Sequence, residues 1–190
     1  MLPEVLQDRA VLYVSGGMLA PEREAFEVVL EFHEELRTHV AGLQEMTALA
    51  VLLPAAPVGV APAGLKGRLL AALEVEPPVE PEALVATDPA GAVEWVNPAF
   101  TTLCGYSLDE LRGRKPGHLL QGPGTDPAAV ERIRAALRER RACRETLVNY
   151  HKDGTRYRAD VRIAPVLDDD GRPLWFVARE RKLPPEPAAP

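Results

Sequence analysis

Two hydrophobic periodicities divide the chain, and the change between them falls near residue 82. Up to residue 53, apolar side chains recur every three or four positions, as they do on one face of a helix. A first helical run ends at Gly16-Gly17, and Pro21 then opens a long segment with a single, largely apolar stripe. The stripe comprises Phe26, Val29, Leu30, His33, Leu36, Val40 and Leu43. After residue 82 the period shortens to that of strands, so the pattern predicts an all-α part followed by a mixed part.

Two proline-rich breaks, residues 54–62 and 76–82, separate these parts, because proline removes a backbone donor and fixes φ. Between the breaks, leucines at helical spacing predict a short fourth helix over residues 65–73. The expected organisation is a helical bundle (1–53), a proline-rich linker with the fourth helix (54–75), a second linker (76–82), a mixed domain (83–183) and a disordered tail (184–190).

The pattern after residue 82 predicts two strands, then helices, then three strands. The strands are expected at 83–87, 92–96, 146–151, 157–166 and 174–179, and the helices at 98–103, 108–111 and 127–141. Turn signals at Asp88-Pro-Ala-Gly91, Asp153-Gly154 and Asp168-Asp-Asp-Gly171 join successive strands. The expected fold class is therefore α+β: an N-terminal helical bundle, then a five-stranded antiparallel sheet with helices on one face.

Charge is distributed unevenly along a chain whose overall pI is about 5.3. Residues 1–80 carry 12 acidic and 5 basic side chains (net −7), and the remainder carries 16 and 17 (net +1). This favours a basic protein partner for the first part, although acidic helix surfaces also serve solubility. The acidic balance argues against direct nucleic-acid binding.

Composition also bounds the class of protein. No apolar run reaches the roughly 20 residues that span a bilayer, and Met1-Leu-Pro-Glu lacks the basic start of a signal peptide. Two cysteines are too few for a disulfide framework, so we expect a cytoplasmic, bacterial protein. No nucleophile, base or phosphate-binding constellation indicates an enzyme.

The mixed part resembles the PAS sensor family. Asp88-Pro-Ala-Gly-Ala-Val-Glu-Trp-Val-Asn-Pro-Ala-Phe100 and Cys104-Gly-Tyr-Ser-Leu-Asp-Glu-Leu111 look like the opening of a PAS domain. Leu119-Leu-Gln-Gly-Pro-Gly-Thr-Asp126 and Thr146-Leu-Val-Asn-Tyr-His-Lys-Asp-Gly154 resemble the flavin-binding LOV branch in particular. The resemblance implies a sensor pocket for a small cofactor.

Three positions match the flavin-holding residues of LOV domains, and five depart from them. The matches are Gln121 and Asn149 at the flavin ring and Arg134 at the phosphate. The departures are Pro116, Gly117, His118, Ala159 and Glu180, which fall where LOV domains have an asparagine, the photoreactive cysteine, an arginine, a second asparagine and a glutamine. The resemblance therefore implies a LOV-like pocket without the cysteine that bonds to excited flavin.

The surviving residues suit a flavin chemically. An amide such as Asn149 or Gln121 can both donate to and accept from the ring edge, and Arg134 can fork onto a phosphate. Glu180 would accept from a ring NH or have a strongly shifted pKa. Leu147-Val-Asn-Tyr-His-Lys-Asp-Gly154 and Tyr157-Arg-Ala-Asp160 also resemble PAS proteins that bind FAD and sense redox state without a cysteine. We therefore expect FAD or FMN, with an unoccupied interaction module, haem or a small metabolite as alternatives.

The helical part resembles the anti-sigma domain that holds extracytoplasmic-function (ECF) sigma factors. Asp8-Arg-Ala-Val-Leu-Tyr-Val-Ser-Gly-Gly-Met-Leu-Ala-Pro-Glu-Arg-Glu-Ala-Phe-Glu27 follows the opening of that family. The family's zinc ligands fall on Val29, His33 and Leu36, so one histidine remains and no zinc is expected. The resemblance implies an ECF sigma factor as partner, held by the bundle and the fourth helix.

The sequence as a whole predicts a signal-responsive transcription regulator, in which a PAS domain that binds flavin without a cysteinyl adduct controls an anti-sigma-like domain. The resemblance also implies a homodimer. The alternative is a cofactor-free PAS module for protein interaction or dimerisation, with the helices as its cap.

Overall fold

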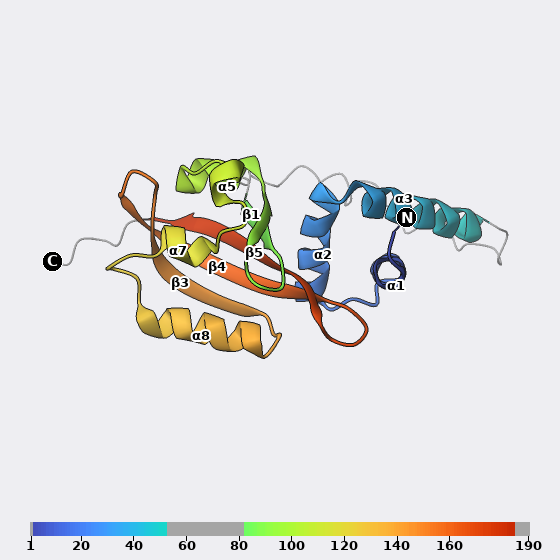
Figure 1. Cartoon of the computed structure of the whole chain (residues 1–190). Coiled ribbons are helices and arrows are strands. Elements are labelled where there is room, and N and C mark those ends of the chain that lie inside the picture. The colour runs from blue at the N-terminus through green and yellow to red at the C-terminus, as the bar shows by residue number, and fades with distance from the viewer. Residues whose placement is uncertain (1, 53–81, 185–190) are drawn as a thin grey trace, which may run out of the picture.

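A computed structural model describes residues 2–52 and 82–184 of the chain (Figure 1). The second of these ranges forms a mixed domain, and the first forms three helices beside it. The expected fourth helix (65–73) and nearly all of the tail lie outside the described residues.

Five strands form one antiparallel sheet in the order β2-β1-β5-β4-β3. Its strands are β1 (Ala83–Thr87), β2 (Val93–Val96), β3 (Cys143–Tyr150), β4 (Arg156–Leu167) and β5 (Pro173–Leu183). The expected pairings are confirmed: β3 pairs with β4, and β4 with β5. The last strand pairs with the first, so β5 lies at the centre of the sheet, between β1 and β4.

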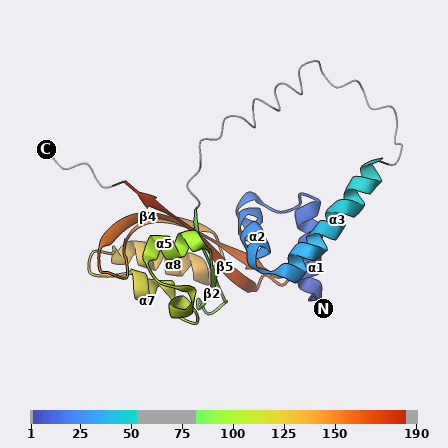
Figure 2. The same cartoon turned by 90° about the horizontal axis from the view of Figure 1, so that it is seen from above.

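Four helices cover one face of the sheet and enclose the space in front of it (Figures 1 and 2). They are α5 (Pro98–Cys104), α6 (Leu108–Leu111), α7 (Pro116–Leu120) and α8 (Pro127–Arg138). The sequence sets three of their starts, because Asn97, Ser107 and Asp126 accept hydrogen bonds from the first backbone N–H groups. Helix α8 is shorter than the expected 127–141; Arg140, with φ 56°, lies beyond its end.

Three helices precede the sheet: α1 (Glu4–Val14), α2 (Ala20–Phe32) and α3 (Glu34–Leu52). The stripe predicted as one long segment is broken at His33, whose backbone is extended (φ −103°, ψ 90°). The His33 Nδ1 atom accepts a hydrogen bond from the backbone N–H of Leu36 and so helps to start α3. Val29 and Leu36, expected to close the apolar stripe, are both fully buried.

Helix α2 packs against β1, β4 and β5 on the face opposite α5–α8. Phe32 at its end stacks on Trp95 of β2, with ring centroids 5.2 Å apart, and lies edge-on to Trp175 of β5 at 6.2 Å. The helices and this face of the sheet share one buried cluster that includes Phe26, Leu84 and Val177. Both faces of the central strands are therefore covered.

Two arginines fasten the helices to the sheet, and both contact the beginning of α2. Arg179 of β5 donates to the backbone carbonyl of Glu24 (2.7 Å) and to the carboxylate of Glu82 (3.2 Å). Arg9 of α1 donates to the backbone carbonyl of Asp168 in the β4–β5 turn (2.9 Å) and also pairs with Glu22. Helix α3 extends away from the sheet (Figures 1 and 2).

Candidate functional site

A cavity of about 640 Å³ lies between the sheet and helices α7 and α8. That volume falls within the range of small-molecule sites. The four residues predicted to hold a cofactor, Gln121, Arg134, Asn149 and Glu180, all line it. Apolar side chains complete the walls: Val85, Leu120, Val130, Ile133, Leu137, Leu147, Val161, Ile163 and Phe176. The structure thus brings the predicted site residues, which lie up to 59 positions apart, into one cavity.

Asn149 of β3 and Glu180 of β5 form the polar part of the cavity's sheet wall. Asn149 Nδ2 lies 3.5 Å from Glu180 Oε2, and both side chains are buried. Burial raises the pKa of the Glu180 carboxyl to about 7, although the hydrogen bond from Asn149 lowers it. Glu180 is therefore poised between its acid and carboxylate forms near neutral pH.

Two buried polar side-chain atoms of strands β3 and β4 have no hydrogen-bond partner among the described residues, and of the two residues only Asn149 lines the cavity. They are Asn149 Oδ1 and the hydroxyl of Tyr157, whose residues pair across β3 and β4. Burial, and then the nearby charge of Glu180, raise the pKa of Tyr157 far above its usual range. An unpartnered buried acceptor costs about 1–3 kcal/mol, so Asn149 Oδ1 gains most from a ligand N–H.

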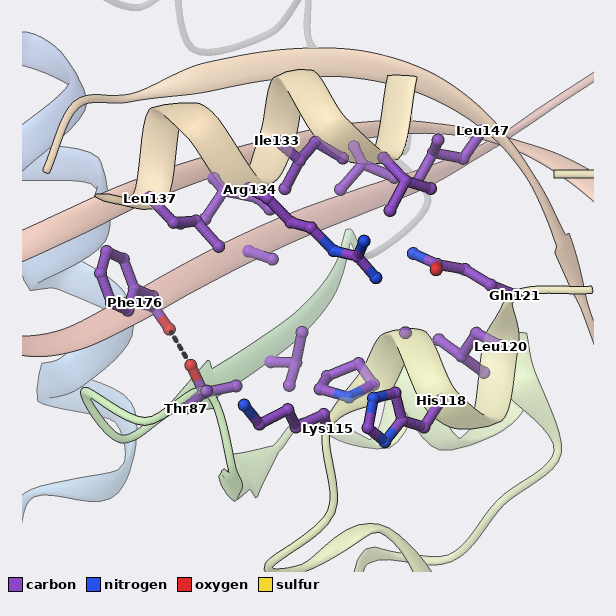
Figure 3. Close-up of a pocket in the computed structure, with 18 of the residues that line it drawn as sticks. Thr87, Lys115, His118, Leu120, Gln121, Ile133, Arg134, Leu137, Leu147 and Phe176 are labelled. Carbon is purple, nitrogen blue, oxygen red and sulfur yellow. Dashed lines mark hydrogen bonds between the residues drawn. The ribbon is translucent and has the colours of Figure 1, made fainter. Parts of the chain in front are cut away.

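Gln121 and Arg134 extend toward each other from opposite walls, from the end of α7 and from α8 (Figure 3). Lys115 and His118 lie on the α7 side, facing Arg134 across the opening (Figure 3). Arg134 is 61 % exposed and lies 3.9 Å from Glu131 on the helix surface. It therefore stands at the mouth, where a phosphate would remain in contact with water.

The position of the missing cysteine lies at the cavity wall, at Gly117 in α7. A Cβ at this position would come within 2.9 Å of the Gln121 amide nitrogen. Since that contact is with the far end of a flexible side chain, a larger residue requires Gln121 to move, not the backbone. Cys104, by contrast, is buried in α5, and burial raises the pKa of its thiol. It is a poor nucleophile.

The mouth of the cavity carries more positive charge than the sequence predicted. Lys115, Arg138 and Arg140 also line the cavity, whereas Glu180 is the only acidic residue among the described residues of its lining. Arg140 reaches the mouth because the chain turns after α8, where it donates to the backbone carbonyl of Gly171 (2.8 Å). The cavity is therefore acidic at its inner wall and basic at its mouth.

No cluster of three or more histidine, cysteine, aspartate or glutamate side chains in the described residues could hold a metal ion. Within the same residues, no helix combines the length and the apolar character needed to cross a membrane.

Known proteins resemble the mixed domain. The family described as PAS domain matches residues 81–179, just over half of the chain. The blue-light-activated histidine kinase of Brucella canis is 37% identical over 92 residues, which are 48% of this chain and 19% of that protein. This chain therefore covers about a fifth of the relative's length.

Solved structures agree with the sequence matches. The light-state structure of the blue-light photoreceptor Aureochrome1 LOV has a TM-score of 0.52 at 34% identity, covering 54% of this chain and 81% of that one. A light-oxygen-voltage domain studied with a flavin analogue has the same TM-score at 30% identity, covering 64% and 88%. The chain belongs to the PAS domain family, and its mixed domain is a PAS/LOV sensor domain related to blue-light photoreceptors.

Proposed function

We propose that the cavity binds a flavin, FMN or FAD, and that the domain senses redox state or light without forming a cysteinyl adduct. The observation that carries this proposal is the convergence of Gln121, Arg134, Asn149 and Glu180 on one cavity. A bound flavin would supply visible-light absorption and reversible electron transfer. The chain supplies the binding, the orientation and the protons.

The donors and acceptors of the cavity fit such a molecule. The flat, apolar ring would lie between Ile133 and Leu147 on one side and Leu120 on the other. Asn149 Oδ1, which is buried and unpartnered, would accept from a ring N–H. Glu180 can donate when protonated and accept when ionised, so it can follow a change of protonation on its ligand.

The phosphate end fits the mouth of the cavity. Arg134 carries a permanently charged, forked donor that suits phosphate oxygens. Lys115 and His118 face it across the opening (Figure 3). A ligand with an apolar, hydrogen-bonding head and an anionic tail therefore complements the cavity from its inner wall to its mouth.

Strand β5 connects the cavity to the helices, and this supports signal transfer. Glu180 faces the cavity, while its neighbour Arg179 faces the opposite side and bonds to Glu24 of α2. A change in the charge or contacts of Glu180 would shift the strand that carries Arg179. The proposed mechanism is a population shift between two placements of α2 on the sheet.

For the output we propose that the helices bind an ECF-type sigma factor. All the large hydrophobic side chains that the described residues expose, Val11, Leu12, Leu19 and Met46, lie in the helical part. Exposed apolar side chains beside acidic ones suit a basic protein partner. A purified ECF sigma factor that does not bind the full chain in titration calorimetry, with or without flavin, would exclude this partner.

A cofactor-free interaction module is the second candidate. The observation in its favour is the apolar contact of α2 with the sheet, in which Phe32 stacks on Trp95. Such a contact would also form if the helices were a permanent cap. In that case the cavity has no signalling role.

The absorption spectrum of the purified chain from 300 to 600 nm separates the two candidates. It is measured as purified, and again after incubation with FMN or FAD and desalting. Flavin bands that survive desalting, and weaken in Asn149→Leu, support the sensor. A colourless protein that takes up neither flavin contradicts it and leaves the interaction module.

A further inference from the structure

The turn between β4 and β5 is bonded from two sides by arginines that lie far apart in the sequence. From α1, Arg9 donates to the backbone carbonyl of Asp168 (2.9 Å) and to the carboxylate of Asp169 (3.3 Å). From the segment that follows α8, Arg140 donates to the backbone carbonyl of Gly171 (2.8 Å). The turn therefore joins the helical part of the chain to a wall of the cavity.

Hydrogen bonds within the turn make it a rigid unit. The backbone N–H of Gly171 donates to the carbonyl of Asp168 (3.0 Å), and the N–H of Asp168 donates to the carbonyl of Arg172 (2.8 Å). The carboxylate of Asp168 also accepts from the backbone N–H of Arg172 (2.6 Å). Because these bonds tie the two arms of the turn together, a displacement on one side of it also moves the other side.

The guanidinium of Arg9 is largely withdrawn from water. Its side chain is 12 % exposed, and its Nε atom is buried without a partner in the part of the chain that the structure describes. One terminal nitrogen pairs with Glu22, and the other bonds to the turn. Since little water reaches this group, water replaces a lost protein partner poorly. Helix α1 therefore holds the turn in place.

Arg140 has a backbone conformation that favours glycine. Among the described residues it is the one non-glycine residue with a positive φ, 56°. Its N–H donates to the carbonyl of Leu137 (3.1 Å), and the N–H of Arg141 donates to that of Ala136 (3.0 Å), as at a helix end that normally carries glycine. An arginine is strained there, and what it adds is the bond to Gly171.

The bond between Arg140 and Gly171 lies at one end of the cavity. Arg140 is exposed and lines this end, and Pro173, two residues after Gly171, lines it as well. Leu137 of α8 and Phe176 of β5 form the walls there (Figure 3). The bond thus joins the end of α8 to the start of β5, the two elements that carry these walls. It is called the strap below.

We propose that the strap closes this end of the cavity, and that Arg9 controls the strap by holding the β4–β5 turn. When α1 leaves the turn, the turn moves away from α8, the strap opens and solutes enter more easily. Coupling of this kind is reciprocal, so opening the strap also loosens α1. A protein that binds the helices would thereby control exchange at the cavity, by a route that does not pass through its inner wall.

Thiol labelling measures access to the cavity without any ligand. Ile133→Cys places a thiol on the α8 wall, where the native side chain is 9 % exposed, and fully buried Cys104 reports global unfolding in the same protein. Iodoacetamide labelling is followed by peptide mass spectrometry. In this background Arg9→Gln and Arg140→Asn should each speed labelling at position 133 about fivefold, as expected for the loss of one hydrogen bond. Asparagine tolerates a positive φ but is too short to bridge to the turn.

Two outcomes of the labelling overturn the proposal. One is a labelling rate at position 133 that neither variant changes. The other is an equal acceleration at Cys104, because this would show that the whole domain opens and that the strap has no separate role.

Hydrogen exchange, followed residue by residue by NMR, tests whether the coupling is reciprocal. Arg9→Gln should speed exchange at the amides of Arg140 and Arg141, more than 130 positions away in the sequence. Arg140→Asn should in turn speed exchange along α1. Faster exchange in only one direction contradicts a shared turn as the connection.

A matched control makes the same substitution at another arginine of the helical part. Arg37 donates to the carbonyls of Leu30 and Glu31 and so ties α3 to α2 without contacting the turn. Arg37→Gln should leave both the labelling and the exchange after α8 unchanged, and an effect as large as that of Arg9→Gln overturns the proposal. If Arg9→Gln does not fold, Asp169→Asn weakens the same contact from the turn. None of these measurements requires a flavin, so their failure is distinct from failure of the proposed function.

Discussion

Asn149 Nδ2 lies 3.5 Å from Glu180 Oε2, so an amide and a carboxyl with a raised pKa meet at the inner wall of the cavity. The amide oxygen of Asn149 has no partner among the described residues. The amide nitrogen of Asn149 therefore has a partner within the protein, whereas its amide oxygen can accept a hydrogen bond from a ligand. The pair is the natural centre of any test of ligand binding.

Replacing Asn149 with leucine should weaken flavin binding at least tenfold. The change keeps the side-chain size but removes the acceptor offered to the ligand, and tenfold corresponds to about 1.4 kcal/mol, the worth of one hydrogen bond. Equilibrium dialysis against FMN and FAD measures the loss. The control is Gln44→Leu on the exposed surface of α3, which should bind as the wild type does. Equal affinities for all three proteins would remove Asn149 from the site.

Replacing Glu180 with glutamine should stabilise the protein above pH 7 but not near pH 4. Burial raises the pKa of this carboxyl from 4.5 to about 7, so between these values the folded state holds a proton that the unfolded state has lost. The wild type therefore loses stability as pH rises through this window, up to about 3 kcal/mol, and the loss is constant above it. Glutamine does not titrate and should lack this loss.

Urea denaturation of the wild type and Glu180→Gln at pH 4, 5, 6, 7 and 8 measures this effect. The difference in unfolding free energy should grow with pH between 4.5 and 7 and then level off. Glu31→Gln on the exposed side of α2 is the control and should show no such trend. A difference independent of pH would mean that Glu180 ionises at its ordinary pKa.

Replacing Gly117 with cysteine should give a flavin-loaded protein that bleaches under blue light. The residue occupies the position of the photoreactive cysteine of LOV domains, and its side chain needs only the flexible end of Gln121 to move. Difference spectra before and after illumination measure the bleaching, and Gly117→Ser is the control without a thiol. Bleaching in the serine variant as well would point to photoreduction instead of a bond to sulfur.

Replacing Arg179 with glutamine should loosen α2 from the sheet without unfolding the PAS domain. The change removes the bonds to the Glu24 carbonyl and to Glu82, a loss of about 1–3 kcal/mol. Hydrogen exchange should rise in α2 and stay unchanged in β3. Arg172→Gln, at an exposed residue of the β4–β5 turn, is the control. Faster exchange throughout the sheet would instead show a global loss of stability.

The two tryptophans of the chain offer a second measure of the same contact. Trp95 and Trp175 both lie against Phe32 at the end of α2. Their fluorescence should therefore change when α2 moves, and Phe32→Ala should reproduce the fully released signal. Flavin itself quenches tryptophan fluorescence, and Phe32→Ala measures this direct quenching. If flavin changes the fluorescence of the wild type no more than it changes that of Phe32→Ala, the cavity and the helices are not coupled.

Local patterns predicted the PAS domain well because its turns and caps lie in short stretches of sequence. Asp88, Asp168 and the glycines after them fix the hairpins, and Asn97 fixes the start of α5. The four site residues came from the resemblance to LOV domains, and they are Gln121, directly after α7, Arg134 in α8, Asn149 in β3 and Glu180 in β5. The expected strands and helices of this domain were correct to within a few residues, but α7 (Pro116–Leu120) was not predicted.

What the sequence did not predict depends on contacts between distant parts of the chain. The apolar stripe gave no sign of the break at His33, because both resulting helices keep their apolar side inward. The docking of α2 on the sheet was missed, although β1 is apolar on both faces and all five of its residues are buried. A strand of that kind needs cover on both sides, and this signal was available in Ala83–Thr87.

Arg179 and Glu180 are consecutive residues, so the carboxyl that faces the cavity and the guanidinium that holds α2 are separated by one peptide unit. A structural change at Glu180 can therefore reach Arg179 without a hinge and without a series of contacts through the core. Because the two residues are adjacent, a substitution cannot easily alter the cavity end (Glu180) without the α2 end (Arg179), since any twist of β5 moves both. Variation in sensitivity would therefore have to come from residues around the strand, such as Asn149 on one side and Glu82 on the other.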